Sequence, residues 1–229
     1  LNVLRDEHEV IPLGKKDCDL QNKEEIISVF TNLKVDLVII AAAYTNVEKA
    51  ENESDKAFSI NSNSIETISI LTKQCNIPII YYSTDYVFDG KSSKEYIEKD
   101  KLNPINIYGK SKLSGEKNVR INKKFIIIRT SRVFSDSKNN FITKIINLAK
   151  KEENLSIVSD EIATPTSSDL ISKVTHKLIN YMNKYKNKNI FGVYHVVAEG
   201  SCSWYDYCTL IVDELLKNKF PIKINLNNI

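Results

Sequence analysis

The chain has 229 residues, of which 42% are hydrophobic and 27% are charged, and its formal net charge is +3. This length can bury the core of one domain or of one and a half, and the composition is ordinary for a globular protein. So small a net charge does not indicate a nucleic-acid partner, and no apolar run approaches the roughly 20 residues of a membrane span.

Cysteines and histidines are scattered along the chain. The residues are Cys18, Cys75, Cys202, Cys208, His8, His176 and His195. The cysteines form no Cys-x-x-Cys pair, which favours free thiols in a reducing cytoplasm over disulfides or a zinc site. The histidines show no metal-ligand spacing, so we expect no metal-ligand cluster and no metal. His195 lies inside an apolar run and is interpreted as a structural histidine.

Apolar, β-branched runs alternate with amphipathic stretches. The runs predict strands at residues 9–13, 35–40, 77–88, 125–130, 156–158 and 193–197. The amphipathic stretches predict helices at 22–32, 54–74, 140–151, 168–185 and 203–216, the last opened by a capping box. A further helix begins after Pro104, and the charged segment Lys91–Lys101 before it is lid-like. This alternation predicts a doubly wound α/β fold with a parallel sheet.

The start of the chain differs from that of a complete dinucleotide-binding fold. Such a fold opens with a strand, a Gly-rich turn and a helix whose amino end holds the pyrophosphate. No glycine lies in a strand-to-helix turn near the start, and Gly109 and Gly115 fall within a later helix. If the fold binds a dinucleotide, its first strand and phosphate loop are therefore expected to be missing from this chain.

Two lysines follow the strand predicted at residues 9–13, in Gly14-Lys15-Lys16. An acidic residue at this point would bind the ribose 2′-hydroxyl of NAD. Lysines suit the 2′-phosphate of NADPH instead, although a loop with two exposed lysines explains the sequence equally well.

Between Tyr82 and Lys112 lie the residues with the clearest chemistry. The strand before them ends at Ser83 and Thr84, which places two hydroxyls at the carboxyl edge of the sheet, where ligands bind in open α/β folds. Tyr108 and Lys112 are four residues apart and share one helix face. A surface helix pair is the plain alternative. If functional, Lys112 would lower the pKa of Tyr108, which could protonate a carbonyl oxygen while Thr84 donates to the same oxygen.

A series of motifs runs in order from about Asp17 to about Leu215. Its members are Ala41–Thr45, Val47–Glu51, Ser83–Phe88, Tyr108–Lys112, Gly115-Glu116, Arg129–Ser131, Pro165-Thr166, Gly192–His195 and Trp204–Tyr207. Together they resemble the dTDP-4-dehydrorhamnose reductases, which belong to the extended short-chain dehydrogenases/reductases. The resemblance implies a Rossmann-like, NAD(P)-binding fold with a smaller C-terminal substrate lobe. Residues 1–131 with about 190–199 would form an incomplete dinucleotide-binding domain, and 132–189 with 200–229 a truncated substrate lobe.

The resemblance also implies an activity. The family reduces the 4-keto group of dTDP-4-dehydro-L-rhamnose with NADPH or NADH, in the cytoplasm, to supply surface polysaccharides such as lipopolysaccharide. Its members are often dimers, so a homodimer is expected.

Residue roles follow from the same resemblance. The implied catalytic residues are Thr84, Tyr108 and Lys112. The implied cofactor contacts are Lys15, Asp19, Leu20, Ala43, Tyr44, Thr45, Tyr82, Tyr108 and Lys112. The implied substrate contacts are Thr84, Asp85, Tyr86 and Arg132. Asn61 resembles an asparagine that supports the active site, and Trp204 is interpreted as a packing anchor.

Departures from the family leave a second hypothesis open. Arg132 stands where the family has a tryptophan that packs on the sugar, and Tyr44 replaces a histidine of some relatives. Without a Gly-rich loop, a bound pyrophosphate would lose several kcal/mol of backbone and helix-dipole interactions. The alternative is therefore a non-catalytic homologue, similar to the regulatory subunit of methionine adenosyltransferase, or a truncated and inactive reductase.

Overall fold

The computed structural model describes residues 2–136, 140–185 and 189–229. The chain divides into two compact units. The first comprises Leu1–Thr130 and His176–Val196, and the second comprises Ser131–Thr175 and Val197–Ile229. Residues 176–189, which the sequence predicts in the substrate lobe, belong to the first unit in the structure.

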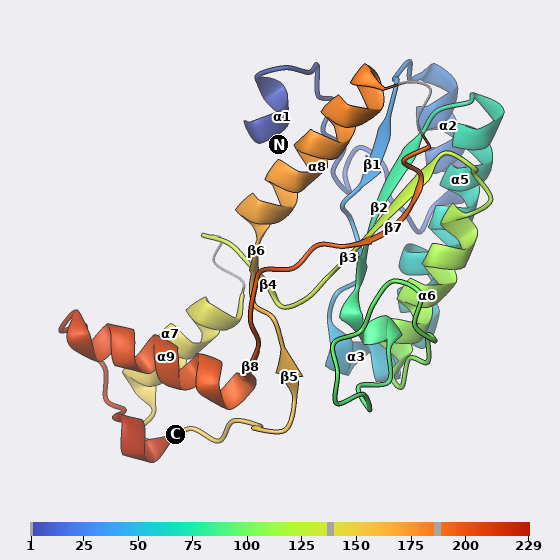
Figure 1. Ribbon diagram of the computed structural model, residues 1–229. Coiled ribbons are helices and arrows are strands. Elements are labelled where there is room, and N and C mark those ends of the chain that lie inside the picture. The colour runs from blue at the N-terminus through green and yellow to red at the C-terminus, as the bar shows by residue number, and fades with distance from the viewer. Residues whose placement is uncertain (1, 137–139, 186–188) are drawn as a thin grey trace. The chain divides into compact units, whose positions relative to one another are not determined.

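The first unit is built on a parallel sheet of four strands in the order β1-β2-β3-β7 (Figure 1). The strands are β1 Val38–Ile40, β2 Ile79–Thr84, β3 Phe125–Thr130 and β7 Gly192–His195. Buried isoleucines open β2 (Ile79 and Ile80) and fill the centre of β3 (Ile126–Ile128), because strands covered on both faces favour β-branched apolar residues. Thr84 pairs with Thr130 in the register of β2 and β3, so both threonines lie at the carboxyl edge. The predicted parallel α/β fold is confirmed.

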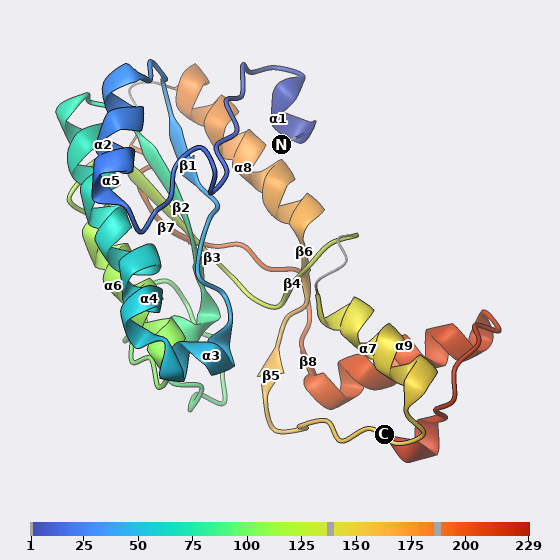
Figure 2. The same cartoon turned by 180° about the vertical axis from the view of Figure 1, so that it is seen from behind.

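Helices cover both faces of this sheet. Figures 1 and 2 show α2, α5 and α6 on one face and the C-terminal part of α8, which belongs to the first unit, on the other, with α1 beside it. The helices are α1 Asn2–Arg5, α2 Lys23–Asn32, α3 Val47–Asn52, α4 Ser54–Phe58, α5 Ser64–Gln74, α6 Ile107–Val119 and α8 Ser168–Lys184. Buried Ile65 and Ile68 of α5 pack with Tyr81 and Ile127 of the sheet to form the core.

One π-helical turn, Ser59–Asn63, interrupts the helix predicted at residues 54–74 and separates α4 from α5. The turn has one buried amide side chain, Asn61, which is 1% exposed. Because π turns occur often at functional sites, this turn makes Asn61 a candidate site residue.

Two predicted strands were wrong. Residues 9–13 and 156–158 have no strand pairing within the described ranges. Near the second segment, Leu155 N donates to Asn228 O and Tyr205 N donates to Val158 O, which are isolated bonds and no ladder. An apolar run becomes a strand only where a neighbouring strand completes its hydrogen bonds, and periodicity alone cannot supply that neighbour. The strand before Tyr86 ends at Thr84, as predicted from its two terminal hydroxyls, and residues 85–88 of the apolar run lie outside it, beginning with a 3-10 turn, Asp85–Val87.

The second unit is built around two helices, α7 Phe141–Lys151 and α9 Trp204–Lys217. A capping box between Ser203 and Asp206 opens α9, as predicted. Two small sheets complete the unit, one parallel (β4 Val133–Phe134 with β6 Thr166–Ser167) and one antiparallel (β5 Ile162–Ala163 with β8 Cys202–Ser203). A 3-10 turn at Leu226–Asn228 follows. The hydrophobic core of the second unit contains Ile145, Ala149, Tyr207, Cys208, Ile211, Val212 and Ile224.

All four cysteines are free thiols, as predicted. Burial raises the pKa of the Cys208 thiol to about 11, so this sulfur stays protonated at neutral pH. Within the described ranges, no helix has both the length and the apolar character needed to cross a bilayer.

Candidate active site

The carboxyl end of β2 brings three of the predicted site residues together. Thr84 caps the 3-10 turn: its hydroxyl accepts a hydrogen bond from Tyr86 N at 3.2 Å and donates one to Asp85 Oδ1 at 2.9 Å. Because the side chain of Thr84 closes this turn, Asp85 and Tyr86 are held next to the strand end.

Tyr108 joins this group from the first turn of α6. Asn106 caps the helix by accepting a hydrogen bond from Gly109 N at 2.7 Å. The Tyr108 ring meets the Tyr86 ring edge-on, with centroids 5.6 Å apart, and the Thr84 hydroxyl is near enough to act on the pKa of the Tyr108 phenol, which it lowers. A Cβ on Gly109 would overlap the carbonyl oxygen of Tyr86, so the glycine permits this close approach.

The prediction that Lys112 acidifies Tyr108 was wrong for this structure. Burial raises the pKa of Tyr108 to about 12, against the lowering effect of the nearby Thr84 hydroxyl, and Asp85 and Tyr86 raise it further. The amine of Lys112 instead donates to the carbonyl oxygen of Tyr82 at 2.6 Å. Sharing a helix face therefore did not make the Lys112 amine a partner of the phenol.

Lys112 is itself strongly perturbed. Its side chain is 2% exposed, and its amine lies 3.9 Å from the centroid of the Tyr81 ring. Burial lowers the pKa of Lys112 to about 7, and the charge of Glu116 opposes the shift. Perturbed groups of this kind concentrate at functional sites, and this amine can exchange a proton near neutral pH.

Asn61 connects the loop after β1 to the helix of Tyr108. Its Oδ1 accepts from Tyr44 N at 2.8 Å, and its Nδ2 donates to Tyr44 O at 3.0 Å and to Ser111 Oγ at 2.9 Å. The Ser111 hydroxyl in turn donates to Tyr108 O at 2.7 Å. Asn61 thus fixes both the loop and the start of α6, which supports the role that the resemblance implied.

The remaining predicted cofactor residues of the first unit lie on two loops. Ala43, Tyr44 and Thr45 follow β1, where the small side chains of the preceding alanines leave the backbone accessible at the sheet edge. On the loop before α2, Lys15 forms an ion pair with Asp19 at 3.4 Å, and Leu20 packs against the core. The exposed amine of Lys15 therefore already has a partner, the Asp19 carboxylate of the same loop.

Arg132 belongs to the second unit. Its backbone is left-handed, with φ 41°, and its guanidinium donates to Cys202 O at 2.8 Å and to Glu161 O at 2.6 Å. The guanidinium carbon lies 3.9 Å from the centroid of the Trp204 ring. Arg132 and Trp204 thus stack on each other inside this unit, and a substrate contact of Arg132 stays a prediction.

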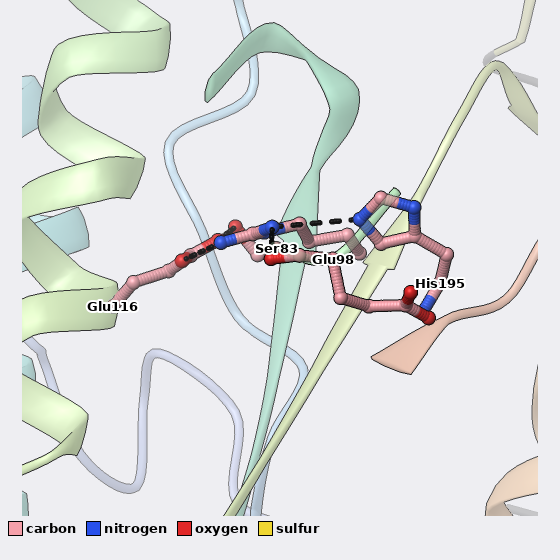
Figure 3. A network of polar contacts seen from close by, with 5 residues as sticks. Ser83, Glu98, Glu116 and His195 are labelled. Atoms are coloured by element: carbon pink, nitrogen blue, oxygen red, sulfur yellow. Dashed lines mark hydrogen bonds and ion pairs between the residues drawn. The ribbon is translucent and has the colours of Figure 1, made fainter. Parts of the chain in front are cut away.

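A buried polar network lies behind the strand end, and sequence analysis did not identify it. Figure 3 shows Ser83 and Glu98 between Glu116 on one side and His195 on the other. Arg129 links them: it binds both carboxylate oxygens of Glu116 and contacts His195 Nε2 at 3.4 Å. The structural interpretation of His195 agrees with these contacts.

The segment predicted as lid-like is fastened to the sheet through this network. The carboxylate of Glu98 accepts from His195 N at 2.9 Å, and the carbonyl oxygen of Tyr96 lies 3.2 Å from His195 Nδ1. The Tyr96 hydroxyl donates to Asp89 Oδ1 at 2.8 Å. This bond and that from Asn103 lower the pKa of Asp89 to about 2, so its carboxylate stays ionised.

Two of the histidines, whose spacing in the sequence showed no metal-ligand pattern, lie close together in the folded chain. Glu7, His8 and His176 present potential ligand atoms that all lie within 4.8 Å of one another. Their separation in the sequence hides this proximity, because the turn after α1 meets α8 only in the folded chain.

Comparisons with known proteins identify the family of this chain. Residues 2–226 match the family described as the RmlD substrate binding domain. The dTDP-4-dehydrorhamnose reductase of Escherichia coli (strain K12) is 36% identical over 212 residues, which cover 92% of this chain and 70% of that protein. The spore coat polysaccharide biosynthesis protein SpsK of Bacillus subtilis (strain 168) is 36% identical over 208 residues, covering 90% and 71%. A solved dTDP-4-dehydrorhamnose reductase from Bacillus anthracis, in complex with NADP, has a TM-score of 0.86 and 33% identity, covering 96% and 75%.

Proposed function

This chain belongs to the dTDP-4-dehydrorhamnose reductase family, and from that premise we propose that Tyr108 and Thr84 carry the NADPH-dependent reduction of a dTDP-linked 4-keto sugar. The substrate proposed is dTDP-4-dehydro-L-rhamnose, and the product is dTDP-L-rhamnose. The observation that carries this proposal is the placement of Tyr108 beside the carboxyl end of β2: the Thr84 hydroxyl accepts from Tyr86 N at 3.2 Å, and the Tyr86 ring contacts the Tyr108 ring at 5.6 Å between centroids.

Tyr108 is the proton donor in this proposal. A phenol with a pKa of about 12 holds its proton throughout the neutral range. As negative charge develops on the carbonyl oxygen of the substrate, that oxygen becomes a strong acceptor, and the Tyr108 proton moves to it. The buried amine of Lys112, with its pKa near 7, lies one helical turn away and can help to restore the proton afterwards.

Thr84 and its neighbours orient the substrate. A hydroxyl has one proton, and that of Thr84 is directed at Asp85 Oδ1 in this structure. The proton turns from Asp85 to the carbonyl oxygen when substrate binds, which adds a second donor to the developing charge. Asp85 and Tyr86 then face the sugar hydroxyls.

The residues present fit a nicotinamide dinucleotide. The small side chains before Ala43 leave the backbone accessible at the end of β1, and Asn61 holds Tyr44 in place beside it. Reduced nicotinamide, when bound, supplies the hydride. The relative that contains NADP and the lysine at position 15 support NADPH as the preferred form.

The cellular setting follows from this role. Free thiols throughout the chain support a reducing cytoplasm, where nucleotide sugars for surface polysaccharides would be made. A homodimer, expected from the family resemblance, is checked by sedimentation equilibrium.

Replacement of Tyr108 by phenylalanine tests the function. We expect Tyr108→Phe to lower kcat for dTDP-4-dehydro-L-rhamnose by at least about 100-fold and to leave NADPH binding, measured by fluorescence titration, unchanged. Tyr194→Phe is the matched control, because the Tyr194 hydroxyl bonds the backbone of Ile190 away from this site. Retained turnover in Tyr108→Phe would refute the proton-donor role, and the absence of saturable NADPH binding in the wild type would refute reductase function for this chain.

A further inference from the structure

We propose that Glu7, His8 and His176 form a binding site for one divalent transition-metal ion, of which zinc is the representative. The site is independent of the reductase chemistry, and all three residues belong to the first unit. Two imidazoles and one carboxylate are a ligand set that zinc accepts, and their potential ligand atoms already lie within 4.8 Å of one another.

His8 provides the first argument. Its Nε2 is buried and has no hydrogen-bond partner in the part of the chain that the structure describes. A buried nitrogen in this condition costs free energy, and a bound ion would remove the cost. The His8 ring meets the His176 ring edge-on, with centroids 5.6 Å apart and planes at 84°.

The surroundings of His176 provide the second argument. Its Nε2 lies 3.1 Å from Glu7 Oε2 and 3.2 Å from Asn180 Nδ2. Asn180 Nδ2 also donates to the same Glu7 oxygen at 2.9 Å. Asn180 therefore holds the Glu7 carboxylate beside the His176 imidazole, so two of the three candidate ligands are already brought together.

The geometry requires a modest adjustment. Ligands at about 2.0–2.1 Å from a tetrahedral zinc ion stand roughly 3.3 Å apart. Glu7 and His176 are already that close, and the side chain of Glu7 is 55% exposed, so a rotation that exchanges its present hydrogen bonds for the ion meets little packing. The ion would connect the turn after α1 to α8, two segments separated by 169 positions in the sequence.

A proton provides the competing explanation. A protonated His176 could form a simple ion pair with Glu7 and need no metal. That explanation leaves His8 Nε2 without a partner, so the behaviour of His8 separates the two cases.

Calorimetric titration of chelator-treated protein with zinc chloride tests the site. We expect one equivalent to bind and the Tm to rise, since zinc would bind the folded arrangement and not the dispersed ligands. His8→Ala and His176→Gln should each weaken zinc binding at least about tenfold, because loss of even an outer partner has that effect. Cys75→Ser should bind as the wild type does, which excludes the exposed thiol as the site.

Three results would overturn the proposal. They are the absence of saturable zinc binding in a several-fold excess of zinc, wild-type zinc affinity in both histidine variants, and loss of zinc binding in Cys75→Ser. Circular dichroism of each variant before titration separates a lost ligand from a lost fold. If His8→Ala is misfolded, the more conservative His8→Gln takes its place.

Discussion

Glu116 of α6 and Arg129 of β3 form a buried ion pair with two parallel hydrogen bonds. Arg129 Nε donates to Glu116 Oε1 at 2.8 Å and Nη2 donates to Oε2 at 2.7 Å, and the side chains are 3% and 1% exposed, respectively. Ser83, which directly precedes Thr84, donates to Glu116 Oε1 at 2.6 Å. Because Glu116 lies one helical turn beyond Lys112, the pair connects the helix of the proposed proton donor to the strand end opposite it.

Breaking this pair should destabilise the protein strongly. Glu116→Leu leaves the Arg129 charge buried without its carboxylate, a change that costs about 3–5 kcal/mol in comparable cases. Urea unfolding followed by circular dichroism measures the loss. Asp169→Asn is the matched control, because the Asp169–Lys173 pair has the same 2.7 Å separation but is more than half exposed. Its removal should change the free energy of unfolding by less than about 1 kcal/mol. Equal losses in the two variants would contradict the argument from burial.

Gly115 should be sensitive to a single added methyl group. A Cβ at this position would overlap the carbonyl oxygen of Asn61 and the hydroxyl of Tyr81. Since both atoms lie in packed elements, Gly115→Ala must push α6 away from the π turn, and overpacking of this kind costs about 1–3 kcal/mol. At Gly14, by contrast, the nearest atom to an added Cβ is Asp17 Oδ2 at 3.5 Å, an ordinary contact. The free energy of unfolding of Gly14→Ala, measured in urea, should therefore lie within about 0.5 kcal/mol of the wild-type value.

The main elements of the fold could be predicted because their signals are local. The amphipathic period of α2 and α7, and the capping box of α9, are written within a few consecutive residues. The failures at residues 9–13 and 156–158 have the opposite origin, since pairing depends on a partner elsewhere in the chain. The π turn of Asn61 had no local signal either.

The candidate site shows the same limit. Thr84 and Tyr108 could be identified because a strand end and a helix start position them. The spacing of Tyr108 and Lys112 fixed their shared helix face, but not the direction of a long, flexible side chain, and the Lys112 amine turned toward Tyr82. The pair of Glu116 and Arg129 was missed because its members come from different elements with no shared pattern.

Asn61 should matter far more than its neighbour Asn63 in the same π turn. Asn61→Ala removes the acceptor of Tyr44 N and the donor to Ser111 Oγ, so we expect a loss of about 1–3 kcal/mol in urea unfolding. Because the same bonds hold the loop after β1 and the start of α6, kcat/KM for keto reduction should fall as well. Asn63 is exposed, so Asn63→Ala should leave both quantities close to wild type. Similar kinetics for the two variants would show that the Asn61 bonds do not position the site.

Lys112 should give the folded protein a stability that rises with pH. Burial lowers the pKa of Lys112 from 10.5 to about 7, so between these values the unfolded chain binds a proton that the folded chain has released. Stability therefore increases from pH 7 toward 10.5, with a slope of up to about 1.4 kcal/mol per pH unit, and this contribution is flat below pH 7. Lys112→Met removes the contribution, so the difference between wild-type and variant urea curves at several pH values isolates it. Lys110→Met, an exposed position on the same helix, should keep the wild-type dependence. If the wild-type and Lys112→Met curves run parallel with pH, the buried amine does not titrate in this window.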